Sequence, residues 1–462
     1  MPQSPSPPIE PFEPFVGSDA PPGRFGHRWL CHLLRRGAVA VSPQRLKTFA
    51  GQSASQVVAA LTGYDPADDR PYSDLLSGLS GTMSPVYNAE DAQKWWLMRL
   101  LDSPRPLQER IALLWHNHFA TSTGKVRQSA LVSRQIDLFR RLGLGNFRDL
   151  LLAVTKDPAM LLWLDGSKNK RGRPNENYAR EVMELFTLGI GHYGEKDVQE
   201  LARALTGWQV LDEAVEFIPV SFDDGQKTIL GRTGTFNVES AVDLLLEQAA
   251  APKFIAWKLL KEFVHPQPMA AHVDHYAARL LHHRWEIKPV LSEILTSRLF
   301  FSDYAWRSKI KSPCELVVGS MLGLETRKDS TFARMSMNNM GQALLAPPSV
   351  KGWDGQEVWI NAHTILQRYN FALDLVTRED AERMTAIYDR RGVRTAEQVV
   401  DHLLAVLLDG ELAPYSRARL IDYLKQDENG KPSPFKLTAE HFANRVRGVA
   451  HLTMCTPEYQ LA

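Results

Sequence analysis

Residues 110–119 read RIALLWHNHF, and their apolar side chains recur at the three- and four-residue spacing of an α-helix. At about 100° per residue, one face of such a helix collects Ile111, Leu114, Trp115, His118 and Phe119. A face this apolar has to pack against other elements, so the stretch predicts a core helix. It also places the imidazole of His118 inside the apolar stripe.

The second histidine of this stretch, His116, lies roughly 160° from His118 around the helix, next to Ala112 and Glu109. Two histidines spaced i, i+2 cannot both bind one metal ion from a regular helix, in contrast to the i, i+4 pair of an HExxH motif. Two alternatives follow. Either only His118 faces the interior, or the helix is distorted or ends at this point.

The same helical period recurs along most of the chain. We expect helices where apolar residues keep this spacing, at 92–101, 131–142, 241–248, 254–263, 290–299, 315–324 and 395–408. Breaks are expected at Ser103-Pro104, at Asp157-Pro158 and in the polar run 166–174. The predicted fold class is therefore mainly α, and the 462 residues allow either two to three domains or one large domain.

Two segments depart from this pattern. Residues 208–236 contain two short β-prone runs, 215–220 and 227–230, on either side of Asp223-Asp224-Gly225, which predicts a small β-hairpin insertion. The segment 1–24 is rich in proline, with eight prolines among its first 22 residues, and it is predicted to be a disordered tail.

The composition excludes several classes of protein. Hydrophobic residues make up 44% and charged residues 23%, as in globular proteins, so neither a disordered nor a fibrous chain is expected. The net charge of +1 argues against nucleic-acid binding, which usually goes with a basic excess. The three cysteines lie far apart without CxxC spacing, which predicts neither a disulfide framework nor a cysteine zinc site.

Signals for export, membrane insertion and nucleotide binding are not found in the sequence. The N-terminus has no charged start followed by an apolar run, and no apolar stretch is long enough to span a membrane. A cytoplasmic protein without a membrane span is therefore expected. Without a Walker loop, a strand-linked GxGxxG or a GxSxG elbow, no nucleotide cofactor and no standard serine hydrolase is expected.

A second helix is predicted over residues 175–189, NENYAREVMELFTLG, because Asn175 is a suitable start and Gly189 a suitable stop. On its helical wheel Glu181 falls inside the apolar arc, and Glu184 lies at the edge of that arc. A carboxylate in an apolar arc costs several kcal/mol unless it is paired, protonated or bound to a metal ion. Glu181 therefore needs a partner.

Three partners for Glu181 are open: a basic side chain, a buried histidine such as His118, or a cation held by both. Glu181 and Glu184 at i, i+3 can converge on one ion, and a histidine would complete a ligand set suited to zinc, iron or manganese. The structural alternative pairs Arg180 with Glu176 and Glu184 along the helix and leaves Glu181 and His118 as a buried hydrogen-bonded pair.

The stretch PPSVKGWDG at residues 347–355 is rigid and aromatic. Two interpretations of its neighbourhood are open: Trp353 and Trp359 line a cleft for a sugar or a peptide, or they anchor the packing of the core.

At these residues the chain resembles the large bacterial family called domain of unknown function 1800 (DUF1800). The matching stretches are RIALLWHNHFATS (110–122), DPAMLLWLDG (157–166), PNENYAREVMELFTLGIGHY (174–193), DVQELARALTGW (197–208), KTILGRTG (227–234), SKIKSPCELVVG (308–319), PPSVKGWDG (347–355), RYNFA (368–372) and PEYQLA (457–462). The resemblance implies a single large helical domain over residues 25–462. It also implies a sulfatase-like partner protein encoded nearby, and frequent export. The chain departs from the family pattern in having no visible export signal and in carrying Phe222 where similar proteins have a histidine.

Two functional hypotheses follow. The first is a metal-assisted enzyme, hydrolytic or oxidative, in which a divalent transition metal lies between two core helices; His118 and Glu181 are its primary ligands, and His116 and Glu184 are further ligands or proton carriers. The second is a non-enzymatic helical partner or scaffold protein that acts with the sulfatase-like protein.

Overall fold

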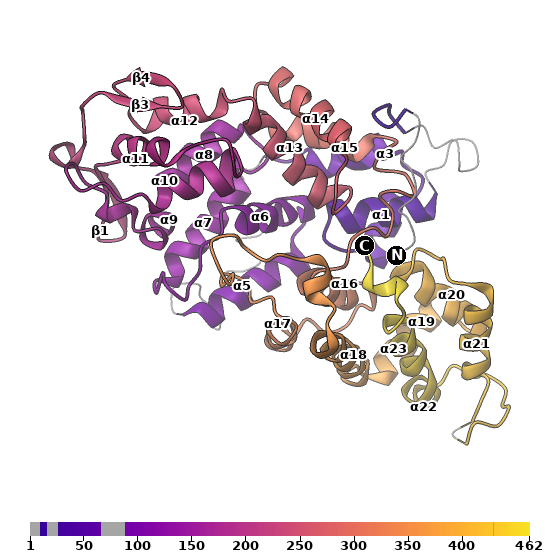
Figure 1. The fold of residues 1–462 in the computed structure, drawn as a ribbon. Coiled ribbons are helices and arrows are strands. Elements are labelled where there is room, and N and C mark those ends of the chain that lie inside the picture. Colours follow the sequence, from indigo (N-terminus) through magenta and orange to yellow (C-terminus); the bar gives the residue numbers. More distant parts are fainter. Residues whose placement is uncertain (1–9, 16–25, 66–87, 428) are drawn as a thin grey trace.

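The computed structural model describes residues 10–15, 26–65, 88–427 and 429–462, and these are folded mainly into α-helices, as predicted (Figure 1). The helices of the first half are α1 (His27–Gly37), α2 (Pro43–Phe49), α3 (Ala54–Thr62), α5 (Ala89–Asp102), α6 (Pro106–His118), α7 (Ser129–Leu142), α8 (Phe147–Thr155), α9 (Pro158–Trp163), α10 (Asn177–Glu181) and α11 (Glu195–Ala204). Those of the second half are α12 (Val238–Leu246), α13 (Ala250–Phe263), α14 (Ala270–His282), α15 (Ile287–Thr296), α16 (Pro313–Gly323), α17 (Ser330–Asn339), α18 (Ala362–Thr377), α19 (Ala381–Arg390), α20 (Ala396–Leu407), α21 (Pro414–Leu424), α22 (Ala439–His441) and α23 (Arg447–Met454).

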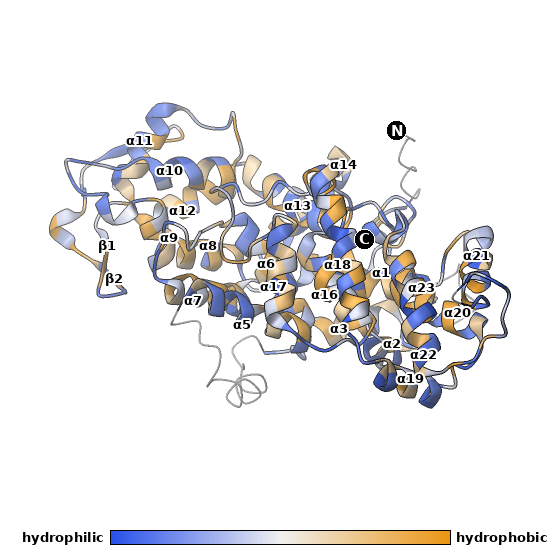
Figure 2. Ribbon diagram, turned by 90° about the horizontal axis from the view of Figure 1, so that it is seen from below, coloured by the Kyte–Doolittle hydropathy of each residue, from blue (hydrophilic) through white to orange (hydrophobic). Residues whose placement is uncertain are grey.

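The predicted helical stretches and breaks are confirmed. Each periodic stretch lies largely within a helix, because its apolar face is buried against its neighbours. The break at Ser103-Pro104 follows the end of α5, and the break at Asp157-Pro158 begins α9, whose N-cap is the Asp157 side chain. Figure 2 shows hydrophobic and hydrophilic residues mixed along each helix, the pattern of amphipathic helices in a shared core.

The insertion at 208–236 is confirmed as β-structure, but its strands pair differently from the prediction. Strand β1 (Trp208–Leu211) pairs with β2 (Ala214–Phe217), and β3 (Lys227–Ile229) pairs with β4 (Arg232–Gly234), each antiparallel. Two tight turns with positive φ, at 212–213 and 230–231, close these hairpins. The residues expected to form the hairpin turn lie between the two hairpins, where Asp223 accepts hydrogen bonds from the Gly225 amide at 3.0 Å and from Arg203 of α11 at 2.9 Å.

Helix α6 lies at the centre of the molecule and contacts α1, α3, α5 and α7 (Figure 1). Buried side chains therefore occur on every side of this helix, including charged ones. Glu109 illustrates this arrangement: it accepts hydrogen bonds from Arg99 of α5 and Arg140 of α7, and all three side chains are buried. This ion cluster joins three helices around the middle of the core.

The final residues of the chain return to the segment before α16. Ile310 and Leu461 form an antiparallel bridge, and the amide of Ala462 donates to the carbonyl of Lys309 at 2.7 Å. The stretches 308–319 and 457–462, which carried part of the resemblance, therefore lie side by side. Helices α19 to α23 gather at one end of the molecule next to this junction (Figure 1).

The predicted disordered tail lies partly outside the described residues, which leave out 1–9 and 16–25. Residues 10–15 differ from the expectation because they pack on the helical body. The Phe12 ring stacks on His275 with centroids 3.7 Å apart, and the Phe15 amide donates to the Thr296 carbonyl at 2.8 Å. Two aromatic anchors thus hold this part of a proline-rich segment.

None of the helices in the described ranges is both long and apolar enough to cross a lipid bilayer. The three cysteines are free thiols, in agreement with their spacing in the sequence.

Candidate functional site

The two histidines of α6 are both buried at its C-terminal end, since the helix has packing partners on every side. His118 Nε2 lies 3.1 Å from the Phe186 carbonyl oxygen, to which it donates a hydrogen bond. Burial first, and then the charge of Lys258, lower the pKa of His118 well below its usual range. His118 is therefore a neutral imidazole whose Nε2 is engaged.

His116 has a different environment. Its ring lies between Trp96 and Trp353, with centroid distances of 5.4 and 5.5 Å. Neither of its ring nitrogens has a hydrogen-bond partner among the described residues, and burial lowers its pKa to about 3. The alternative in which only His118 faces the interior is thus wrong; the helix ends at His118, and both rings are enclosed.

The predicted carboxylates lie where the second helix changes its period. Residues 177–181 form α10, and the π-helix η2 (Val182–Thr187) continues it. Because a π-helix has more residues per turn, a wheel drawn at α-helical period misplaces side chains along it. Glu181 is half-buried rather than enclosed; burial and the charge of Glu184 raise its pKa. Glu184 accepts a hydrogen bond from the Tyr193 hydroxyl at 2.6 Å.

The ion pairs predicted along this helix are partly confirmed. Arg180 pairs with Glu176 at 3.3 Å, as expected. Its second partner is Glu195 at 2.7 Å rather than Glu184, because the start of α11 lies against α10. The alternative of a His118–Glu181 hydrogen bond is wrong, since the His118 donor is directed to the Phe186 carbonyl.

Metal binding by His116, His118, Glu181 and Glu184 stays a prediction. Within the described ranges, no three or more His, Cys, Asp or Glu side chains are arranged around a common point suitable for an ion. A metal ion shared by His118 and Glu181 would require the Phe186 hydrogen bond to break or the other ring nitrogen to serve as the ligand.

Elemental analysis tests this prediction. If His118 and Glu181 hold a metal ion, the purified protein is expected to carry about one equivalent of zinc, iron or manganese, and Glu181→Gln to reduce that content. Glu176→Gln, which changes a carboxylate on the neighbouring turn, serves as the matched control and is expected to leave the content unchanged. A content below about 0.2 equivalents in the unmodified protein would contradict the metal assignment.

A pocket opens beside the end of α6 that bears His118. It measures about 240 Å³, and its walls come from α6, α13, the segment 309–315 and the segment 351–359. We call it the basic pocket, because five cations and three carboxylates line it: Arg110, Lys258, Lys261, Lys309 and Lys351, with Glu262, Glu315 and Asp354. Three of the stretches that carry the family resemblance, 110–122, 308–319 and 347–355, meet at this pocket.

One side of the basic pocket is a buried ion network. Arg110 pairs with Glu262 at 2.7 Å and with Glu315 at 2.5 Å, and Lys309 pairs with Glu262 at 3.3 Å. Burial would raise the pKa of Glu315, but the charges of Arg110 and Lys309 outweigh it and lower that pKa. Burial lowers the pKa of Lys309 to about 8. These carboxylates are consequently occupied by cations of the protein itself.

Lys258 and Lys261, both on α13, line the pocket as well. Among the described residues, no carboxylate pairs with either ammonium group. The Lys258 Nζ lies 5.2 Å from the centre of the Phe254 ring, and the Lys261 Nζ lies 4.9 Å from that of Trp257. Burial, then the charges of Lys261 and Lys351, lower the pKa of Lys258 to about 8.

The loop 347–355 closes the pocket through a tight contact with α6. Gly352 has φ +83°, and the Trp353 amide donates to Asn117 Oδ1 at 2.7 Å. Trp353 is buried and packs on His116, so it is a packing anchor, and it also contributes to the pocket wall together with Trp359. The packing interpretation is therefore confirmed for Trp353, whereas a cleft for a sugar or a peptide stays a prediction.

Comparison with known proteins places the chain in a family. The family model named "Protein of unknown function (DUF1800)" matches residues 32–461, nearly the whole length. The chain belongs to the DUF1800 family. Searches of curated proteins and of solved structures found no match.

In this DUF1800 protein the basic pocket contains residues that the sequence did not single out, namely Arg110, Asn117, Lys258 and Lys309. One signal was available: three of the stretches that carry the DUF1800 resemblance each hold a cation, and they proved to be walls of one pocket. Lys258 had no such signal, because a lysine in a periodic helix is usually a solvated residue.

Proposed function

We propose that this DUF1800 protein binds a small anionic molecule, bearing a phosphate, sulfate or carboxylate group, in the basic pocket, and that Lys258 holds the anion. The observation that carries the proposal is the Lys258 ammonium group, which lines the pocket without a carboxylate partner among the described residues.

The charges of the other lining residues support an anionic ligand. Glu262 and Glu315 pair with Arg110, and Asp354 pairs with Lys351 at 2.6 Å. The positive charge in excess therefore resides on Lys258 and Lys261. An unpaired ammonium group that is taken out of water costs several kcal/mol, and a bound anion offsets that cost.

The size and the walls of the pocket indicate a small ligand. A cavity of about 240 Å³ is smaller than the sites of drug-sized molecules. Trp257, Trp353 and Trp359 line it, so an anion with a short organic body finds aromatic surface next to the cations. The pKa of about 8 also allows Lys258 to give up a proton near neutral pH.

The chemistry done on such a molecule stays a prediction. The sequence suggests a metal-assisted hydrolysis or oxidation. His118, one of the predicted metal ligands, also lines the basic pocket. The alternative, a non-enzymatic partner of a sulfatase-like protein, stays a prediction as well.

Titration with sulfate tests the proposed binding, because sulfate keeps its charge between about pH 6 and 9. Saturable quenching or enhancement of tryptophan fluorescence is expected, and Lys258→Met is expected to weaken binding at least about tenfold, as the loss of a charge-assisted hydrogen bond does. The matched control is Lys253→Met: this lysine lies on the same helix, is exposed, pairs with Asp274 and does not line the pocket.

The pH dependence of sulfate binding follows from Lys258. Its folded-state pKa is lowered to about 8, so the cation is present at pH 7 and is lost as the pH rises through 8. Sulfate affinity is therefore expected to fall between pH 7 and 9, and this fall should become smaller in Lys258→Met, in which Lys309, with a pKa of about 8, is left to titrate in the pocket. Equal affinities of Lys258→Met and the unmodified protein, or no saturable binding, would refute the proposal.

A further inference from the structure

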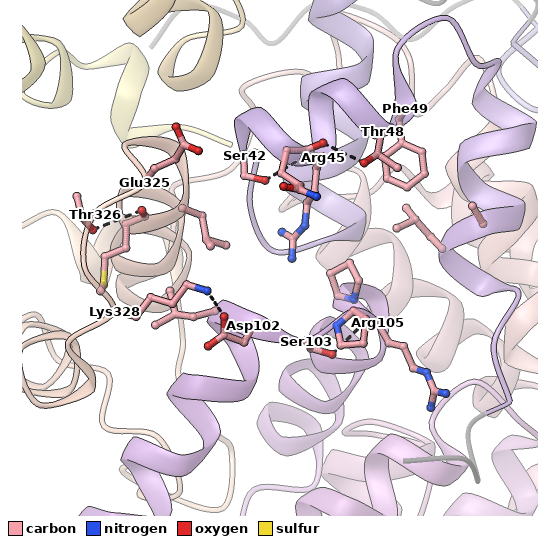
Figure 3. A pocket seen from close by; sticks show the side chains of 18 of the residues that line it. Ser42, Arg45, Thr48, Phe49, Asp102, Ser103, Arg105, Glu325, Thr326 and Lys328 are labelled. Carbon is pink, nitrogen blue, oxygen red and sulfur yellow. Dashed lines mark hydrogen bonds and ion pairs between the residues drawn. The ribbon is translucent and has the colours of Figure 1, made fainter. Parts of the chain in front are cut away.

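A second pocket shares no lining residue with the basic pocket. It measures about 720 Å³ and is bounded by α2, α3, the end of α5, the start of α6 and the segment after α16. We call it the Arg45 pocket, because the guanidinium group of Arg45 points from α2 into the cavity, whereas Arg105 points away (Figure 3).

Arg45 is held in place by the backbone. Its Nη1 donates to the carbonyl oxygens of Ala38 and Ala40 at 2.9 and 3.0 Å, and Ser42 caps the first turn of its helix. These bonds use one nitrogen of the guanidinium group. Burial lowers the pKa of Arg45 only to about 10, so the group is charged at neutral pH.

The carboxylates of the pocket are already paired with other cations. Asp102 pairs with Lys328, and Glu325 accepts from Arg391 at 2.8 Å. Among the described residues, no carboxylate pairs with Arg45. Burial first, and then the charge of Arg45, lower the pKa of Lys328. The two cations that line the cavity therefore repel each other. The lining cations thus outnumber the acids.

The remaining walls combine apolar side chains with polar ones such as Gln44, Thr48 and Thr326. Phe49, Leu61, Tyr64, Leu101 and Leu322 line the pocket, and its volume is in the range of sites for organic molecules. An arginine fork fits the two oxygens of a phosphate or a carboxylate. This group of apolar side chains beside one oriented guanidinium group therefore suits an organic molecule with an anionic head.

We propose that the Arg45 pocket is a second ligand site, which binds an organic anion with its phosphate or carboxylate head on Arg45 and its apolar body against the surrounding side chains. The site does not depend on the proposed function of the basic pocket, since the two pockets share no residue.

Calorimetric titrations with phenyl phosphate, phenylacetate and phenol test this site at about 150 mM salt, where charges further away than about 8 Å are screened. The two anions are expected to bind saturably, and the tighter of them identifies the preferred head group. Neutral phenol is expected to bind at least about tenfold more weakly, because it lacks the charge that Arg45 meets.

Two variants locate the binding. Arg45→Met is expected to abolish it, but this variant also loses the bonds to Ala38 and Ala40 and can unfold. Thr48→Glu avoids this problem: Thr48 is exposed, lines the pocket and stands three residues after Arg45 on α2, so the new carboxylate pairs with the guanidinium group in competition with the ligand. This variant is expected to weaken binding at least about fivefold.

Lys47→Glu is the matched control for Thr48→Glu. It lies on the same helix, is exposed, changes the net charge by more than Thr48→Glu does, and does not line the pocket. Unchanged binding in Lys47→Glu is the expected result, and Lys258→Met, which removes the anion-holding group of the basic pocket, is expected to retain the binding that Thr48→Glu weakens. The proposal is overturned if neither anion binds below about 10 mM, if Thr48→Glu binds as the unmodified protein does, or if Lys258→Met removes the binding.

Discussion

Glu109→Gln is expected to lower the free energy of unfolding by about 3–5 kcal/mol, the cost of removing one partner from a buried ion cluster. The Glu109 carboxylate is 1% exposed, and it accepts from Arg99, Arg140 and the Trp96 indole. A neutral amide would leave two buried guanidinium groups without their common counter-charge. Chemical denaturation followed by far-UV circular dichroism measures the change.

Asp137→Asn is the matched control for Glu109→Gln. Asp137 also pairs with Arg140, at 2.5 Å, but its side chain is 46% exposed. An exposed pair is worth at most about 1 kcal/mol, so this variant should remain near the stability of the unmodified protein. An equal decrease in the free energy of unfolding of the two variants would show that burial does not determine how much these ion pairs stabilise the protein.

The stability that Glu109 contributes also depends on pH. Burial would raise the pKa of Glu109, but Arg140 and Arg99 outweigh it and lower that pKa below the unfolded value. The contribution is therefore fully present above the unfolded pKa, near about 4.3, and is lost as the pH falls through the folded pKa. The difference in stability between Glu109→Gln and the unmodified protein should accordingly shrink in acid.

Gly352→Ala is expected to lower the free energy of unfolding by about 2–5 kcal/mol and to weaken sulfate binding in the basic pocket. A Cβ at this position would lie 2.3 Å from Asn117 Oδ1 and 2.4 Å from the Asn117 carbonyl oxygen, and the backbone has φ +83°. The new methyl group would push the loop 347–355 away from α6 and break the bond between the Trp353 amide and Asn117.

The control for this substitution is Gly392→Ala. Gly392 has a similar φ of +72°, but among the described residues no atom lies within 4 Å of the point that a Cβ would occupy, so only the backbone strain of about 1 kcal/mol is expected. The difference between the two variants, measured by thermal denaturation and by sulfate titration, isolates the contact with Asn117. Equal effects would mean that the close approach of the loop to α6 contributes nothing.

The candidate site could be predicted from the sequence only in part. Helical periodicity identified the helix that bears His118, since a period near 3.6 residues is a local property. The interpretation of Glu181 was less successful, because the π-helix that begins at Val182 changes the period of that helix. A wheel drawn with one period cannot show such a change in a segment that also contacts α12 and α13.

The sequence by itself determined that this protein is mainly helical, that His118 lies in the core, and that the chain resembles one family along most of its length. The tertiary structure alone decided which charges meet. Lys258, Arg110 and Trp353 come from segments far apart in the chain, and they line one pocket only because α13 and the loop 347–355 pack beside α6. Periodicity reports which face of a helix is buried, whereas the electrostatics of a pocket depend on the neighbours that long-range packing supplies.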